Sequence, residues 1–248
     1  MFSGRHAFVL GGSGGIGSQV SAALAEAGAS VCVHGRRRHE KFDRLAADIR
    51  KKTSCTQLFQ ELPPELPDAV PEAIAGELLR ADILCVCFGP FLQKPLDAMS
   101  GDDWNRIVYL NYTFPGMLIS GALGAMKRRH WGRILVFGGT RTESVHGFAT
   151  NAAYAGAKTA LCSLVKSAAG AYAAYGITCN AILPGFADTE YLSDRARAAL
   201  QAKLPGRTLI PVQAIARAAL FVLGSPHING ALLSVDSGWD PVFSKTYF

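Results

Sequence analysis

Residues 8–20 read FVLGGSGGIGSQV, in which a short apolar run is followed by a glycine-rich turn. The apolar run predicts a β-strand, and the Ala-rich residues 18–27 predict a helix. Gly11, Gly15 and Gly17 would allow a tight turn, a close approach of the backbone to a pyrophosphate, and packing of the helix start on the sheet. The stretch therefore predicts a strand-turn-helix unit that binds a dinucleotide. Two more residues of this turn are expected to contact the cofactor, Ser13 and Ile16.

Apolar, β-branched runs alternate with longer Ala- and Leu-rich stretches of helical period along the whole chain. The strand-like runs include HAFVL, SVCVHG, DILCVCFG, GRILVFGG, ITCNAILPG and ALLSVDSG. Nearly continuous hydrophobic strands are typical of a parallel sheet that helices cover on both faces. The pattern predicts an α/β protein with a single Rossmann-type domain over residues 1–248, built on a doubly wound parallel sheet.

Two segments fit the alternation less well. Residues 61–72 are rich in Pro and acidic side chains, which predicts a loop with at most a short helix. Residues 186–210 follow a strand end and contain helical stretches broken by Pro205 and Gly206. We expect this second segment to form a mobile lid over a site.

The composition is that of one globular core, with 49% hydrophobic and 18% charged residues. Apolar runs are interrupted before they reach the roughly 18–20 residues that span a bilayer, and the start does not resemble a signal peptide. We expect a cytoplasmic protein without a membrane partner. The six cysteines lie mostly in apolar runs without a His or Cys cluster, so we expect reduced core thiols and no metal site.

The net charge of +6 comes partly from two short basic clusters, at residues 35–41 and 126–133. Neither has the interleaved aromatic residues of a nucleic-acid stacking platform, so we expect small anionic ligands or acidic partners instead. The first cluster follows the strand SVCVHG, where NAD-binding proteins carry an acidic residue. Arg36 at this place suits a 2′-phosphate and predicts NADP(H), with Arg37 beside it. The alternative is a solvated basic helix start.

Tyr154 and Lys158 lie four residues apart in the stretch AAYAGAK, so on a helix they would share one face. Taken alone, this pair is also typical of an ordinary amphipathic helix. Together with the other motifs, however, it resembles the short-chain dehydrogenase/reductase family over nearly the whole chain. The matching motifs, in order, are GGSGGIG, Asn111 in YLNYT, the Tyr154 and Lys158 pair, PGFADT, and INGALLSVDSG.

The resemblance implies a role for each matched residue. Tyr154 would be the general acid, and Lys158 would hold the nicotinamide ribose and lower the pKa of the phenol. Asn111 would support a proton-relay water, and Thr189 would bind the carboxamide of the cofactor. Three further positions are implied to line the cofactor, Gly89, Pro184 and Gly185.

The chain also departs from the family pattern. Residues 86–89 read VCFG where most relatives have Asn-Asn-Ala-Gly, and the Asp that is common after the third strand is not evident in residues 54–62. The Ser expected at the end of the fifth strand is replaced by Gly139, and the nearest hydroxyl belongs to Thr140. We assign Thr140 the role of polarising the substrate carbonyl, with Thr142 and Ser144 as alternatives.

The resemblance implies NADPH-dependent reduction of a ketone to a secondary alcohol, most similar to that of 3-oxoacyl-acyl-carrier-protein reductases. An acidic carrier could meet Lys127, Arg128 and Arg129, although these residues could equally complement a helix dipole. The alternative is a non-catalytic NADP(H)-binding sensor or structural protein. The family also implies a homotetramer or homodimer, and the segment after Asp236 is a candidate for its interface, with three aromatic residues, Trp239, Phe243 and Phe248.

Overall fold

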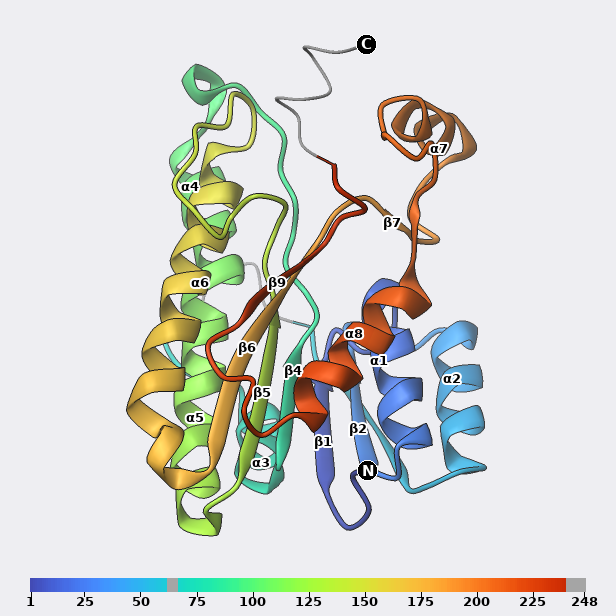
Figure 1. Ribbon diagram of the computed structural model, residues 1–248, viewed down its shortest axis with the longest axis vertical. Coiled ribbons are helices and arrows are strands. Elements are labelled where there is room, and N and C mark those ends of the chain that lie inside the picture. Colours follow the sequence, from blue (N-terminus) through green and yellow to red (C-terminus); the bar gives the residue numbers. More distant parts are fainter. Residues whose placement is uncertain (62–66, 240–248) are drawn as a thin grey trace.

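Seven parallel strands form one sheet in the order β3-β2-β1-β4-β5-β6-β9 (Figure 1). The computed structural model describes residues 1–61 and 67–239. The strand order reverses between β1 and β4, which confirms the predicted doubly wound sheet. The strands are β1 (His6–Leu10), β2 (Ser30–Gly35), β3 (Cys55–Phe59), β4 (Ile83–Val86), β5 (Gly132–Phe137), β6 (Ile177–Pro184) and β9 (Leu232–Val235).

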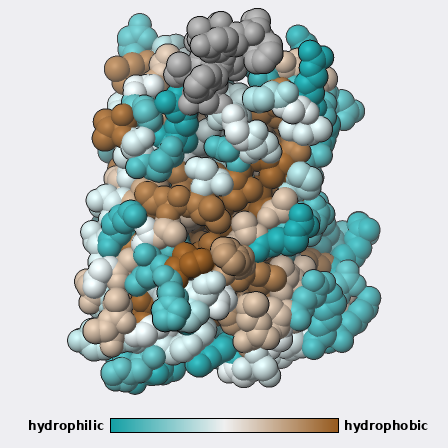
Figure 2. Space-filling model, in the orientation of Figure 1, coloured by the Kyte–Doolittle hydropathy of each residue, from teal (hydrophilic) through white to brown (hydrophobic). Residues whose placement is uncertain are grey.

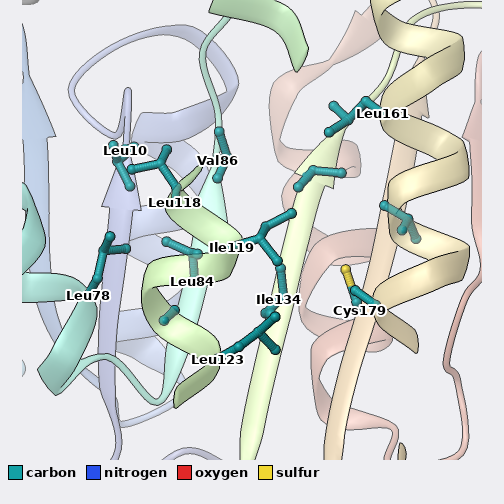
Figure 3. Packing of buried hydrophobic residues seen from close by; sticks show 14 of the residues in the cluster. Leu10, Leu78, Leu84, Val86, Leu118, Ile119, Leu123, Ile134, Leu161 and Cys179 are labelled. Carbon is teal, nitrogen blue, oxygen red and sulfur yellow. The ribbon is translucent and has the colours of Figure 1, made fainter. Parts of the chain in front are cut away.

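Helices cover both faces of the sheet because its central strands are buried on both sides. Alternate residues of β1 face different layers: Phe8 and Leu10 belong to one hydrophobic cluster, and Ala7 and Val9 belong to the other. Figure 3 shows the first cluster between the strands and their covering helices. The helices are α3 (Glu72–Arg80), α5 (Phe114–Arg129) and α6 (Ala152–Tyr172) over this cluster, and α1 (Gly15–Glu26), α2 (Glu40–Arg50) and α8 (Val212–Gly224) over the other.

The helical stretch between β4 and β5 changes its winding where Asn111 lies. It starts with α4 (Gly101–Val108), which Ser100 and Asp103 cap reciprocally at its N-terminus. A π-helical turn (Tyr109–Thr113) then leads directly into α5. The turn holds Asn111 fully buried, and such turns occur frequently at functional sites.

The segment predicted as a lid is fastened at both ends. β7 (Ala187–Asp188) pairs in parallel with β8 (Ile210–Pro211), and α7 (Asp194–Gln201) lies between them. Arg197 of α7 forms an ion pair with Asp188. Figure 1 shows α7 standing apart from the main sheet, above α8. The segment is therefore a closed loop on a two-stranded base.

The remaining described segments lie outside the main sheet and its covering helices. The stretch 61–72 leads into α3, but its residues 62–66 lie outside the described part, as do Phe243 and Phe248. Two short 3-10 turns complete the described elements, at Leu96–Ala98 and Ala173–Tyr175. Within the residues that the structure describes, no helix is both long and apolar enough to cross a membrane.

One face of the molecule carries a hydrophobic band across its middle (Figure 2). Phe221 on α8 leaves 63% of its surface exposed, and the outermost strand β9 adds the half-buried Leu232, Leu233 and Val235. β9 is the edge strand of the sheet; its Leu232 packs against one hydrophobic cluster and its Leu233 and Val235 pack against the other.

Candidate active site

The glycine-rich turn joins β1 to α1 by a very close approach of two backbone segments. A Cβ atom on Gly17 would lie 2.2 Å from the carbonyl oxygen of Gly11, so only glycine fits there. Gly11 and Gly15 adopt φ values of +69° and +48°, in the left-handed region that favours glycine. Ser21 donates its hydroxyl to the Gly12 and Gly17 carbonyls and fixes the turn from the helix side. The turn is a tight cradle of the kind that admits a pyrophosphate.

A cavity of about 590 Å³ opens beside this turn, at the carboxyl edge of the sheet where the strand order reverses. Its position and size suit a dinucleotide, since ligands of open α/β sheets bind at this reversal. The lining includes seven predicted residues: Gly11, Ser13, Gly15, Ile16, Arg36, Gly89 and Thr189. It also includes residues that the sequence reasoning missed, among them Gly14, His34, Gln60, Glu61, Cys87, Phe88, Pro90, Arg106 and Tyr191.

His34 is the most informative of the missed residues. Its Nδ1 accepts a hydrogen bond from the Gly11 amide at 3.2 Å, and its Nε2 lies 3.0 Å from the Gln60 carbonyl oxygen, to which it donates. Burial lowers the pKa of His34 below its ordinary value, which favours this neutral tautomer. His34 therefore ties the glycine-rich turn to the end of β3. The signal in the sequence was a polar residue inside the apolar strand SVCVHG.

Arg36 and Arg37 both lie beside the carboxylate of Glu61. Arg36 lines the cavity, is 73% exposed and has its Nε 3.7 Å from Glu61, whereas Arg37 pairs with Glu61 at 3.0 Å and is not among the lining residues. The two guanidinium groups lower the pKa of Glu61, Arg37 most strongly. Of these two arginines, Arg36 is therefore the one that lines the cavity, and Glu61 lies within ion-pair distance of both.

Asn111 and Lys158 converge on the backbone of Gly89. A Cβ atom on Gly89 would lie 2.3 Å from Asn111 Oδ1 and 3.1 Å from Lys158 Nζ. The Asn111 amide donates to the carbonyls of Pro90 and Ile107, at 2.9 and 3.0 Å, while its buried Oδ1 has no partner among the described residues. A buried acceptor of this kind needs a donor, and a relay water suits the place.

Lys158 is an ammonium group inside the protein, with 3% of its surface exposed. It donates to the carbonyl oxygen of Phe137, the last residue of β5, at 2.7 Å. Burial lowers the pKa of Lys158 to about 8. Cys87, in place of the family's asparagine, lines the cavity near this ammonium and is a thiol whose pKa burial raises. Lys158 thus changes charge close to neutral pH.

Tyr154 stands one turn before Lys158 on α6, as the spacing predicted. Its ring meets Phe91 edge to face at 5.0 Å, and Lys158 Nζ lies 5.8 Å from the ring centroid. Burial raises the pKa of the phenol to about 12. The expectation that Lys158 lowers this pKa is wrong for this arrangement, because the ammonium is directed to Phe137 and burial prevails. Burial therefore keeps the phenol of Tyr154 protonated at neutral pH.

The hydroxyl groups near the end of β5 are engaged elsewhere in the protein. Thr140 donates to the carbonyl of Pro184 at 3.1 Å, and the buried Thr142 donates to the carbonyl of Gly139 at 2.8 Å. Ser144 lies 2.8 Å from His146 on the surface. A Cβ atom on Gly139 would lie 3.4 Å from the Tyr154 hydroxyl, so Gly139 occupies the place from which a serine would reach the reacting oxygen.

Pro184 is the last residue of β6, and Gly185 follows it on the same edge of the sheet. The Gly185 amide bonds to the Val235 carbonyl of β9 at 2.9 Å, and a Cβ atom on Gly185 would lie 2.8 Å from the Asp236 Cα. These two residues fix the point at which the chain leaves the sheet and enters the lid segment. Thr189 of that segment lines the cavity. Asn111 and Lys158 thus lie against Gly89, which lines the cavity, and Tyr154 lies one helical turn from Lys158. None of these three predicted residues lines the cavity itself, and neither does Pro184 or Gly185.

Comparison with known proteins agrees with this arrangement. The sequence profile of the short chain dehydrogenases matches residues 5–199. The chain is 31% identical over 242 residues to the 3-oxoacyl-acyl-carrier-protein reductase FabG of Escherichia coli (strain K12), covering 96% of this chain and 98% of that one. It is 27% identical to the D-beta-hydroxybutyrate dehydrogenase of Rhizobium meliloti (strain 1021), covering 95% and 98% of the two chains.

A solved structure with NADP bound gives the same result for the fold. It is described as an NAD(P)-dependent gluconate 5-dehydrogenase from Beutenbergia cavernae and superposes with a TM-score of 0.83 at 26% identity, covering 96% of this chain and 97% of that one. The glycine-rich cradle, the Tyr154 and Lys158 pair on α6 and these full-length matches lead to one conclusion. The chain belongs to the short-chain dehydrogenase family and is an NAD(P)-dependent oxidoreductase.

Proposed function

We propose that this protein reduces a ketone to a secondary alcohol with NADPH, and that its substrate is a 3-oxoacyl compound. The observation that carries the proposal is that Lys158 Nζ and the unpartnered Asn111 Oδ1 lie against Gly89, which lines the cavity, with the Tyr154 ring centroid 5.8 Å from Lys158 Nζ. A half-buried phenol beside a buried ammonium and a buried amide oxygen is costly to maintain without a chemical use. The 3-oxoacyl substrate is supported by the relatives at about 31% identity.

When bound at the glycine-rich turn, NADPH would supply a hydride for the carbonyl carbon in this mechanism. Tyr154 gives its phenolic proton to the carbonyl oxygen, which becomes the hydroxyl of the product. Lys158 stabilises the phenolate that forms on Tyr154. A water held by Asn111 Oδ1, beside the Lys158 ammonium, then supplies the proton that restores the phenol. Thr140 would polarise the carbonyl, and to do so its hydroxyl must exchange the Pro184 carbonyl for the substrate oxygen.

The basic cluster at the end of α5 does not support carrier docking beside this site. α5 ends at Arg129, just before β5 begins, so the cluster lies at the amino edge of the sheet and the site at the carboxyl edge. Arg129 also pairs with Asp82 at 3.0 Å, and Lys127 lies over the Tyr175 ring. A carrier-bound substrate therefore rests on the resemblance to the reductases. Self-association, which the family also implies, would use the exposed Phe221 of α8 and the edge strand β9.

A second function, cofactor sensing without catalysis, has one observation in its favour. Thr140 and Thr142 donate their hydroxyl protons to backbone carbonyls, so neither is free to polarise a substrate. Binding of NADPH without turnover of any carbonyl compound would select this alternative.

Replacing Tyr154 by Phe tests the reductase proposal directly. NADPH oxidation should be followed with 3-oxoacyl thioesters, free ketones and keto-sugar acids. Tyr154→Phe should lower turnover of the accepted substrate by about a hundredfold or more while leaving NADPH affinity unchanged, because only the proton donor is removed. Tyr172→Phe, at the other end of the same helix, is the matched control and should behave as wild type. Near-normal turnover by the Tyr154 variant would exclude this general acid.

The preference for NADPH should depend on Arg36. A guanidinium contact to a 2′-phosphate is charge-assisted, so Arg36→Leu should lower the NADPH to NADH preference by about tenfold or more in kcat/KM. A second change at Gly35 is unsuitable, because a Cβ there would lie 2.7 Å from both Phe42 and Ser13. Arg38→Leu is the control, since Arg38 pairs with Asp43. A wild type that prefers NADH would contradict the assignment.

The pH dependence of reduction should report Lys158. The pKa of Tyr154 is raised to about 12, so the phenol keeps its proton well above neutral pH. The pKa of Lys158 is lowered to about 8, so the ammonium is present below that pH and is lost as the pH rises through it. The kcat/KM for NADPH should therefore fall above about pH 8. Recovery of activity on return to pH 7 would exclude unfolding, and a rate that is flat to pH 10 would contradict the assignment.

Substitutions at Thr140 and Gly139 test whether the Thr140 hydroxyl replaces the serine that the family pattern has at position 139. If Thr140 donates to the carbonyl, Thr140→Val should lower turnover by about a hundredfold, Thr140→Ser should remain active, and Gly139→Ser should bring no gain. The opposite result, an active Thr140→Val enzyme that Gly139→Ser accelerates, would show that the site works without this donor. The three variants should be compared by turnover and by NADPH affinity.

A further inference from the structure

A carboxylate of the lid segment occupies the phosphate-binding end of α1. Glu190 Oε1 accepts a hydrogen bond from the backbone amide of Gly15, the first residue of α1, at 3.0 Å. The same oxygen lies 3.0 Å from Lys41 Nζ, near the start of α2. This amide belongs to the turn that would cradle the cofactor pyrophosphate. The protein thus places one of its own anions where an anionic ligand would bind.

Tyr191 covers the same turn from above. A Cβ atom on Gly14 would lie 2.0 Å from the Tyr191 hydroxyl oxygen, and one on Gly15 would lie 3.2 Å from the Tyr191 ring. The phenol therefore rests directly on the backbone of the turn, with its other side in solvent. A pyrophosphate and this pair of side chains cannot share the space. Lid residues and cofactor must compete for it.

Electrostatics explain why Glu190 stays there. The residue before α1, Gly14, provides no side-chain cap, and the first turn of α1 contains no acidic residue, so its amides lack a local acceptor. Burial opposes ionisation of Glu190, but the hydrogen bonds from Gly15 and from its own amide, together with Lys41, outweigh it and lower its pKa. The carboxylate is charged at neutral pH and favoured by the helix dipole.

The attachment of the segment allows this contact to open. Glu190 lies two residues beyond β7, whose pairing with β8 fastens the base of the lid. The side chain of Glu190 is 34% exposed, and Tyr191 is 74% exposed. Rotation of these two residues would free the turn without disturbing the β7 and β8 pair.

We propose that Glu190 is an internal competitor of the cofactor pyrophosphate, so that NADPH binds by displacing Glu190 and Tyr191 from the turn. Lys41 then passes from the carboxylate to the incoming phosphate and is a cofactor-binding residue. The inference rests on the cofactor binding of the proposed function. It makes cofactor entry and lid opening a single event.

The test compares Glu190→Ala with Asp194→Asn, which removes an exposed negative charge from the same lid segment. NADPH affinity should be measured by fluorescence titration and the association rate by stopped flow. Glu190→Ala should bind NADPH several-fold more tightly and faster, and Asp194→Asn should match wild type. Adenosine 2′-monophosphate, which has no pyrophosphate, should bind all three proteins alike. Equal tightening for both ligands would indicate general charge repulsion and overturn the proposal.

Hydrogen exchange gives a readout that does not depend on turnover. In the free protein, the peptide containing Gly15 should exchange faster in Glu190→Ala than in wild type, and NADPH should remove the difference. Adding Lys41→Gln to Glu190→Ala should weaken NADPH binding. With Glu190 already removed, the second change can act only through the proposed contact of Lys41 with the cofactor phosphate. Unchanged exchange and affinity in Glu190→Ala, with NADPH bound by wild type, would refute the competition alone. NADPH binding by neither protein would refute the proposed function, and binding by the variant alone would support the competition.

Discussion

The approach of Gly17 to the carbonyl of Gly11 is the constraint on which the site depends. It brings the first turn of α1 against the end of β1, with no side chain between them. Free amides then point to the place where the strand order reverses, and they require an anion there. The structure meets that requirement internally with Glu190, and His34 holds the other side of the same turn. In the proposed competition, cofactor binding and the position of the lid segment would both depend on this one backbone contact.

The polar groups of the proposed reaction are likewise positioned by backbone contacts. The ammonium of Lys158 is held at the end of β5 by a backbone carbonyl, and the amide of Asn111 is held by a π-helical turn. The Lys158 ammonium and the Asn111 side-chain oxygen both lie against the backbone of Gly89. The first carries a positive charge, and the second has no hydrogen-bond partner among the described residues. Because burial raises the pKa of Tyr154 and lowers the pKa of Lys158, the two residues would keep separate roles in the proposed reduction, one as proton donor and the other as charge.

The sequence predicted what depends on local pattern. Apolar alternation was sufficient for the doubly wound sheet, and the spacing of Tyr154 and Lys158 was sufficient to place both on one turn of α6. It could not predict the hydroxyl bond of Thr140 to Pro184, because that acceptor comes from another strand. The contact of Glu190 with Gly15 joins residues 175 positions apart, and no periodicity reports it. The direction of the Tyr154 pKa also depended on burial, which spacing does not reveal.

The pairing of β7 with β8 has a consequence for how this protein can change. Closing a loop costs conformational entropy, but once the ends are fixed the extra cost rises slowly, by about 0.6 kcal/mol for each doubling of length. Because the two short strands fix the ends, residues between them can be inserted or deleted while the parallel sheet stays as it is. The span that carries α7 can therefore diverge in length and composition far faster than the nucleotide cradle below it.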